Sequence, residues 1–130
     1  MIRPLKTLLF IAGVLHILVG LVTIIVPNQW AAMGGILEVT EYERWLLAVL
    51  GASFVAIGVS VTIAGRDPFK HLNWVKFVIL KSLLTVVVGM YLVINGSVDF
   101  GQVGPIIILD ALFAIVFLGL YPWRAASRGE

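Results

Sequence analysis

Cysteine is absent from the sequence and charged residues are scarce, and each shortage excludes a set of functions. Without cysteine the chain forms no disulfide, thiol nucleophile, cysteine-ligated iron–sulfur cluster or CxxC redox centre. Charged residues make up 12% of the 130 positions, whereas soluble domains carry about 25%. Hydrophobic residues make up 61%, and the mean hydropathy is +1.09. A soluble domain of this size cannot hide so much apolar surface, so the composition predicts a protein that lies largely in lipid.

Motifs of the common enzyme classes are missing as well. The chain has no G-x-S-x-G, no H-E-x-x-H and no P-loop sequence. It has two histidines, too few without cysteine for a dedicated zinc or copper site. We therefore predict no metal and no catalytic residue. Whether the protein is an enzyme stays open, although the sequence favours a role without catalysis of its own.

Four apolar segments are long enough to cross a bilayer. They cover residues 5–26, 42–64, 72–94 and 103–121, and glycine, proline or asparagine follows each of them. Segments of about 20 residues span the hydrocarbon core at a rise of 1.5 Å per residue. The sequence predicts an all-α polytopic membrane protein, in which residues 1–130 form a single four-helix transmembrane bundle. The first segment is longer than a signal-peptide core, so we interpret it as a retained signal anchor.

Basic residues predict the orientation of these spans. They cluster at the two termini and in the loop after the second span: Arg3, Lys6, Arg66, Lys70, Lys76, Arg124 and Arg128. The other two loops hold Arg44 among the acidic residues Glu38, Glu41, Glu43 and Asp99. Because cytoplasmic loops are rich in Lys and Arg, we expect both termini in the cytoplasm, with Arg44, Arg66, Lys76 and Lys81 as interface or topology residues. A multi-pass protein of a bacterial inner membrane fits this pattern.

Small residues predict how the helices pack, because lipid tails do not drive helix association and close backbone contact does. The second span carries a small-residue stripe at four-residue spacing: Ala48, Ala52, Ala56, Ser60 and Ala64. The first span has Gly13 and Gly20 on the face of His16. We expect these faces to point into the bundle. The connection of residues 28–40 is expected to be a short amphipathic turn on the outer interface.

Ionisable and polar side chains inside the spans are candidate functional residues. With a rise of 1.5 Å per residue, Lys81 lies roughly 12 Å and Asp110 roughly 20 Å above the inner edge. Side chains lean toward the N-terminus of their own helix, so these two diverge. We therefore predict that Lys81 snorkels to the inner interface. Asp110 is expected to contact Tyr91 or His16, with Thr23 as a third candidate.

Two interpretations of this predicted polar cluster stay open. Asp110 either fastens helices together by a hydrogen bond or belongs to a proton or ligand site. His16 is either a satisfied core histidine or a proton shuttle or axial ligand of a tetrapyrrole. A quinone, lipid or tetrapyrrole is thus a possible ligand, although the sequence itself requires no cofactor.

The segment ERWLLAVLGASFVAIGVSVTIAGRDPFKH, residues 43–71, resembles the DoxX-like group of small bacterial four-helix membrane proteins. It combines an arginine at the outer start of a span with a small-residue helix and a basic GRDP loop, and VPNQW after the first span is similar too. The resemblance implies a four-helix architecture and makes Arg44 a candidate functional residue. Some members of the group associate with redox or sulfur-metabolising complexes. It implies no catalytic residue.

Two functions follow as hypotheses. The first is a small accessory or structural subunit of a larger bacterial inner-membrane assembly, with membrane-protein partners or further copies of itself, and no nucleic acid. The alternative is a membrane-embedded binding protein for a quinone, lipid or pigment, linked to a redox complex.

Overall fold

Four long helices and one short helix make up the computed structural model, which describes residues 2–123. The long helices are α1 (Ile2–Ile25), α3 (Glu41–Ala64), α4 (Leu72–Ile94) and α5 (Phe100–Leu120). Each is long and apolar enough to cross a membrane. The predicted all-α architecture with four spans is therefore confirmed, and the predicted third span agrees with α4 to the residue. The connection after α1 contains a helix, α2 (Pro27–Met33), where the sequence predicts only a turn.

Local sequence explains where the helices begin and end. Thr40 and Glu43 form a capping box at the start of α3, in which each side chain bonds to the backbone N–H of the other. Asp99 caps α5 by accepting a hydrogen bond from the backbone N–H of Gly101 at 2.7 Å. This cap lets α5 start at Phe100, three residues earlier than predicted. Gly96 follows α4 with φ of +74°, a conformation that only glycine adopts without strain.

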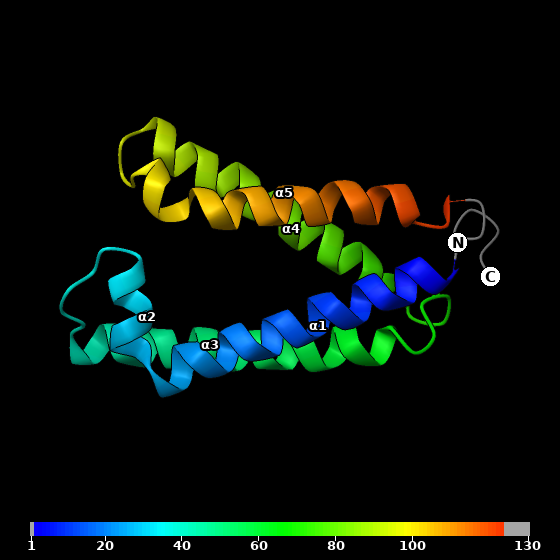
Figure 1. The fold of residues 1–130 in the computed structure, drawn as a ribbon, viewed down its shortest axis with the longest axis horizontal. Helices are drawn as coiled ribbons and strands as arrows, with labels where there is room; N and C mark the ends of the chain where they lie inside the picture. Colours follow the sequence, from blue (N-terminus) through cyan, green and yellow to red (C-terminus); the bar gives the residue numbers. More distant parts are fainter. Residues whose placement is uncertain (1, 124–130) are drawn as a thin grey trace.

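The long helices associate as two antiparallel pairs, α1 with α3 and α4 with α5 (Figure 1). The start of α1 and the end of α5 lie at the same end of the molecule, where the two pairs approach each other, and the pairs diverge toward α2 (Figure 1). The main apolar core lies where the pairs meet and takes side chains from all four helices: Leu5, Leu9, Ala12, Val61, Val75, Val78, Ile79, Phe117 and Tyr121. The molecule is thus closed mainly at one end.

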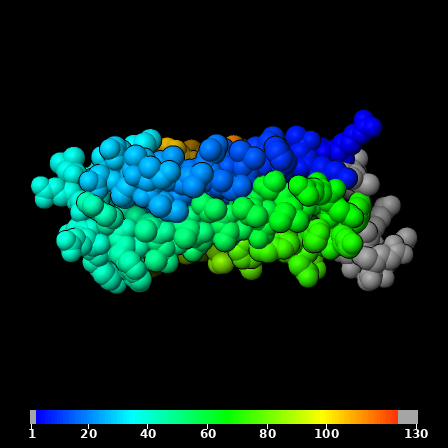
Figure 2. Space-filling model, turned by 90° about the horizontal axis from the view of Figure 1, so that it is seen from below, coloured from blue at the N-terminus to red at the C-terminus, as the bar shows by residue number. Residues whose placement is uncertain are grey.

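Glycines hold α1 and α3 together, and the two helices touch along their length (Figure 2). A Cβ atom on Gly58 would lie 2.6 Å from the Gly13 carbonyl oxygen, and one on Gly20 would lie 2.5 Å from the Gly51 carbonyl oxygen. Only glycine permits such an approach. The predicted role of Gly13 and Gly20 is confirmed.

The alanine stripe of α3 does not mediate this pairing, so that prediction is wrong. Ala52 and Ala56 are exposed, Ala48 and Ser60 are partly exposed, and only Ala64 is buried. Ala56 precedes Gly58 by two residues, which places it about 200° around the helix. Because the glycines allow a closer approach than the alanines do, α1 packs on the glycine face and the alanine face points outward.

Candidate functional site

Lys81 and Asp110 form an ion pair between α4 and α5, in the middle of two spans. Nζ of Lys81 lies 2.8 Å from Oδ1 and 3.2 Å from Oδ2 of Asp110. The Ser82 hydroxyl donates a third hydrogen bond to Oδ1 at 3.0 Å. Asp110 is only 5% exposed, whereas the Lys81 side chain is 22% exposed. Paired charge and three hydrogen bonds offset the cost of placing this carboxylate in an apolar interior.

This contact overturns the predicted geometry of the polar residues. Lys81 does not snorkel to the interface, and Asp110 does not pair with Tyr91, whose side chain is 65% exposed. The error came from the bounds of the last span. Lys81 lies nine residues after Leu72, or about 14 Å into α4, and Asp110 lies ten residues before Leu120, or about 15 Å from that end of α5. The two residues are therefore at nearly the same depth.

His16 is the third ionisable group in this region, and it comes from α1. Its ring is buried and packs edge-on against Phe54 of α3, with the ring centroids 5.8 Å apart. Nδ1 lies 2.7 Å from the Ala12 carbonyl oxygen. Because a carbonyl only accepts hydrogen bonds, Nδ1 carries a proton, and in the neutral ring the lone pair is on Nε2. The hydrogen bond of the His16 ring is to its own helix, and the ring makes no direct bond to Lys81 or Asp110.

Thr23, the remaining member of the predicted cluster, is fully buried, but its hydroxyl does not bond to the ion pair. Its hydroxyl donates to the Val19 carbonyl oxygen of its own helix at 2.7 Å. The structure therefore leaves His16, Thr23 and Tyr91 without a direct bond to Asp110, and it adds Ser82. The sequence holds a signal for Ser82, since it is adjacent to an intramembrane lysine, but a serine in an apolar span more often bonds its own backbone.

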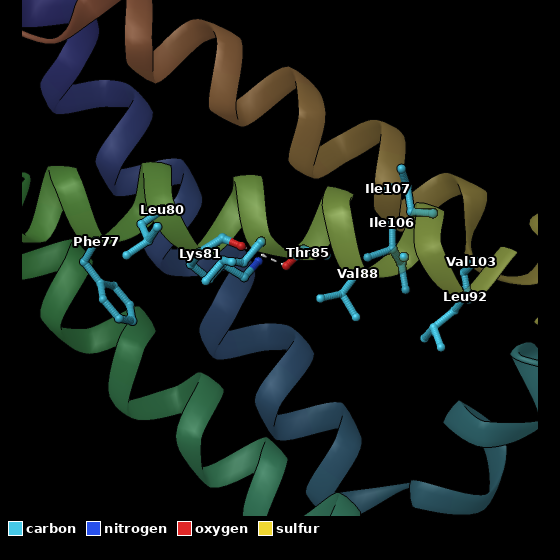
Figure 3. Close-up of a pocket in the computed structure, with 11 residues that line it drawn as sticks. Phe77, Leu80, Lys81, Thr85, Val88, Leu92, Val103, Ile106 and Ile107 are labelled. Carbon is cyan, nitrogen blue, oxygen red and sulfur yellow. Dashed lines mark hydrogen bonds between the residues drawn. The ribbon is translucent and has the colours of Figure 1, made fainter. Parts of the chain in front are cut away.

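A groove runs along α4 and α5 on the side where Lys81 emerges (Figure 3). Its volume is about 570 Å³, and it is lined by Phe77, Leu80, Lys81, Leu84, Thr85, Val88, Gly89, Leu92, Val103, Ile106 and Ile107. In Figure 3, Phe77 and Leu80 of α4 lie on one side of Lys81 and Thr85, and the labelled side chains of α5 lie on the other. The Thr85 hydroxyl donates to the Lys81 carbonyl oxygen at 3.0 Å. Lys81 is thus the one charged group in the groove lining.

Apart from Lys81, the residues expected to set the orientation of the spans lie outside this site. Arg44 is exposed in the first turn of α3, Arg66 is exposed directly after α3, and Lys76 is exposed near the start of α4. Arg124 and Arg128 lie outside the described residues. Within residues 2–123, no three His, Asp or Glu side chains gather in a group that could hold a metal ion.

Fold and site together define a multi-pass α-helical membrane protein with four spans, a buried ion pair and an apolar groove beside it. Comparison of the chain with family models, with curated proteins and with solved structures finds no match. The DoxX-like resemblance therefore stays a prediction.

Proposed function

We propose that the chain is a small accessory or structural subunit of a larger assembly in a bacterial inner membrane, without catalysis of its own. The observation that carries this proposal is the unused small-residue face of α3. Ala52 and Ala56 are exposed on the side away from α1. In a membrane, a face of this kind lets a neighbouring helix approach closely, and within this chain no described helix occupies it.

The internal chemistry supports the same proposal. The buried charges Lys81 and Asp110 neutralise each other and join α4 to α5, which is what a fastening role requires. Basic residues, among them Lys6 and Lys76, lie at the end of the molecule where α1 begins and α5 ends. They favour an orientation with both termini in the cytoplasm. The DoxX-like resemblance, with its redox-associated members, would place such a subunit beside a redox complex.

Copurification in a mild detergent tests the proposal. We expect another membrane protein to accompany the wild-type chain and to be lost from an Ala52→Leu/Ala56→Leu variant. A Leu50→Phe variant is the matched control, because Leu50 is exposed on the same helix but lies about 120–160° around it from the two alanines. A particle that contains only this chain, as a monomer or homo-oligomer, would count decisively against an accessory role.

A second function, a membrane-embedded binding protein for a quinone, lipid or pigment, is favoured by the α4–α5 groove. The groove has the volume and the apolar lining of a small-molecule site, with one charged group to orient a ligand. An absorption spectrum and organic extraction of the purified protein would test it. Protein that carries no pigment, quinone or lipid, and that does not bind any of them when they are added, would rule it out.

A further inference from the structure

We propose that the α4–α5 groove binds a neutral, tail-bearing molecule whose head group carries a carbonyl oxygen, and that this oxygen accepts a hydrogen bond from Lys81. The inference rests on the second of the two proposed functions, the binding protein, and specifies which ligands the groove selects. It is independent of whether α3 docks a partner.

Lys81 has one more hydrogen-bond donor than Asp110 satisfies. An ammonium group has three N–H donors, and the carboxylate oxygens of Asp110 occupy two of them, at 2.8 Å and 3.2 Å. The third donor has no acceptor among the described residues. Lys81 lines the groove, and hydrocarbon offers no bulk water to accept a hydrogen bond from it. An acceptor oxygen in the groove would therefore remove the free-energy cost of an unsatisfied N–H donor.

The charges at the groove are already balanced. Lys81 and Asp110 already cancel each other, and apart from Thr85 the rest of the lining is apolar. The Thr85 hydroxyl proton is engaged by the Lys81 carbonyl oxygen, so it adds no free donor. An anionic head group would bring an uncompensated charge into the middle of the membrane. A neutral acceptor such as a ketone, a quinone carbonyl or an ester fits the groove, and a free carboxylate or phosphate does not.

The groove follows α4 from Phe77 to Leu92, and Lys81 lies near its Phe77 end. Leu92 follows Lys81 by eleven positions, which corresponds to about 16 Å of helix. Val88, Val103 and Ile106 line that stretch, as Figure 3 shows. A head at Lys81 therefore leaves a long apolar channel for a tail that points toward the α2 end of the molecule.

A benzophenone with a hexadecyl tail tests the inference on the whole protein in lipid nanodiscs. Its ketone is a neutral acceptor, and on illumination the same carbonyl bonds covalently to nearby C–H groups, so peptide mapping locates the head. Competitors of equal chain length separate the chemistries: 2-octadecanone offers a neutral carbonyl, octadecane offers a tail alone, and octadecanoate offers an anion. Val88→Phe fills the groove, and Val87→Phe, exposed on α4 but outside the lining, is its matched control.

We expect labelling on the groove residues of α4 and α5, reduced by Val88→Phe and unchanged by Val87→Phe. One charge-assisted hydrogen bond should make 2-octadecanone about tenfold more effective than octadecane as a competitor. That preference should vanish in a Lys81→Met/Asp110→Asn double variant, which removes the donor together with its counter-charge while the tail channel remains.

Two results would overturn the inference and leave lipid binding intact: equal competition by octadecane and 2-octadecanone, or stronger competition by octadecanoate. Labelling that Val88→Phe does not reduce would instead remove the groove as a binding site. In that case both the inference and the binding-protein function fail.

Discussion

Removing one partner of the Lys81–Asp110 pair should destabilise the protein more than removing both. In Lys81→Met, the carboxylate of Asp110 loses both hydrogen bonds from Lys81 and keeps only the one from the Ser82 hydroxyl. In Asp110→Asn, the ammonium faces a neutral amide. Loss of one partner from a buried pair costs about 3–5 kcal/mol of unfolding free energy. We expect the larger loss for Lys81→Met, because Asp110 is 5% exposed and the Lys81 side chain is 22% exposed.

The Lys81→Met/Asp110→Asn double variant leaves no buried charge, and its asparagine can still accept from Ser82. It loses two interhelical hydrogen bonds, each worth about 0.6 kcal/mol within a membrane protein. The double variant should therefore be about 1 kcal/mol less stable than the wild type, well below the sum of the single changes. This non-additivity is the quantity that a double-mutant cycle isolates.

Unfolding by SDS in mixed micelles, followed by tryptophan fluorescence, gives the four free energies of the cycle. Lys76→Met is the control, since Lys76 is exposed near the start of α4, and its effect should stay within about 0.5 kcal/mol. If the two single changes add up to the effect of the double change, the pair is not formed in the folded protein, and the depth argument for α4 and α5 fails with it.

Three further predictions concern helix pairing and helix ends. Gly58→Ala should lower the free energy of unfolding by about 1–3 kcal/mol through steric conflict with α1. Gly119→Ala is its control, because a Cβ atom there would meet nothing within 4 Å. This control should be neutral or stabilising in the same SDS assay. Thr40→Ala should cost about 1 kcal/mol by removing the capping box of α3, and hydrogen exchange should rise in the first turn of α3 and nowhere else. Gly96→Ala should cost about 1 kcal/mol, because the backbone there has a positive φ; an unchanged SDS midpoint would show that this turn adopts another conformation.

Much of the fold was predictable because hydropathy and length suffice to recognise a membrane span. The predicted bounds of α4 agree with the structure, and those of α3 differ by one residue. The start of α5 was missed by three residues, because Gly101 and Gln102 look like loop residues while the cap at Asp99 draws them into the helix. That small error was enough to misplace Asp110 relative to Lys81.

The sequence by itself determined that this is a four-span α-helical membrane protein and that Asp110 lies among buried residues, because the bilayer imposes the length and the apolar character of each span. Tertiary structure alone decided which faces meet. Gly51 and Gly58, not the alanines, contact α1, since the closer backbone approach prevails. Asp110 pairs with Lys81 because depth depends on where two separate helices begin and end, and no pattern within one helix contains that relation.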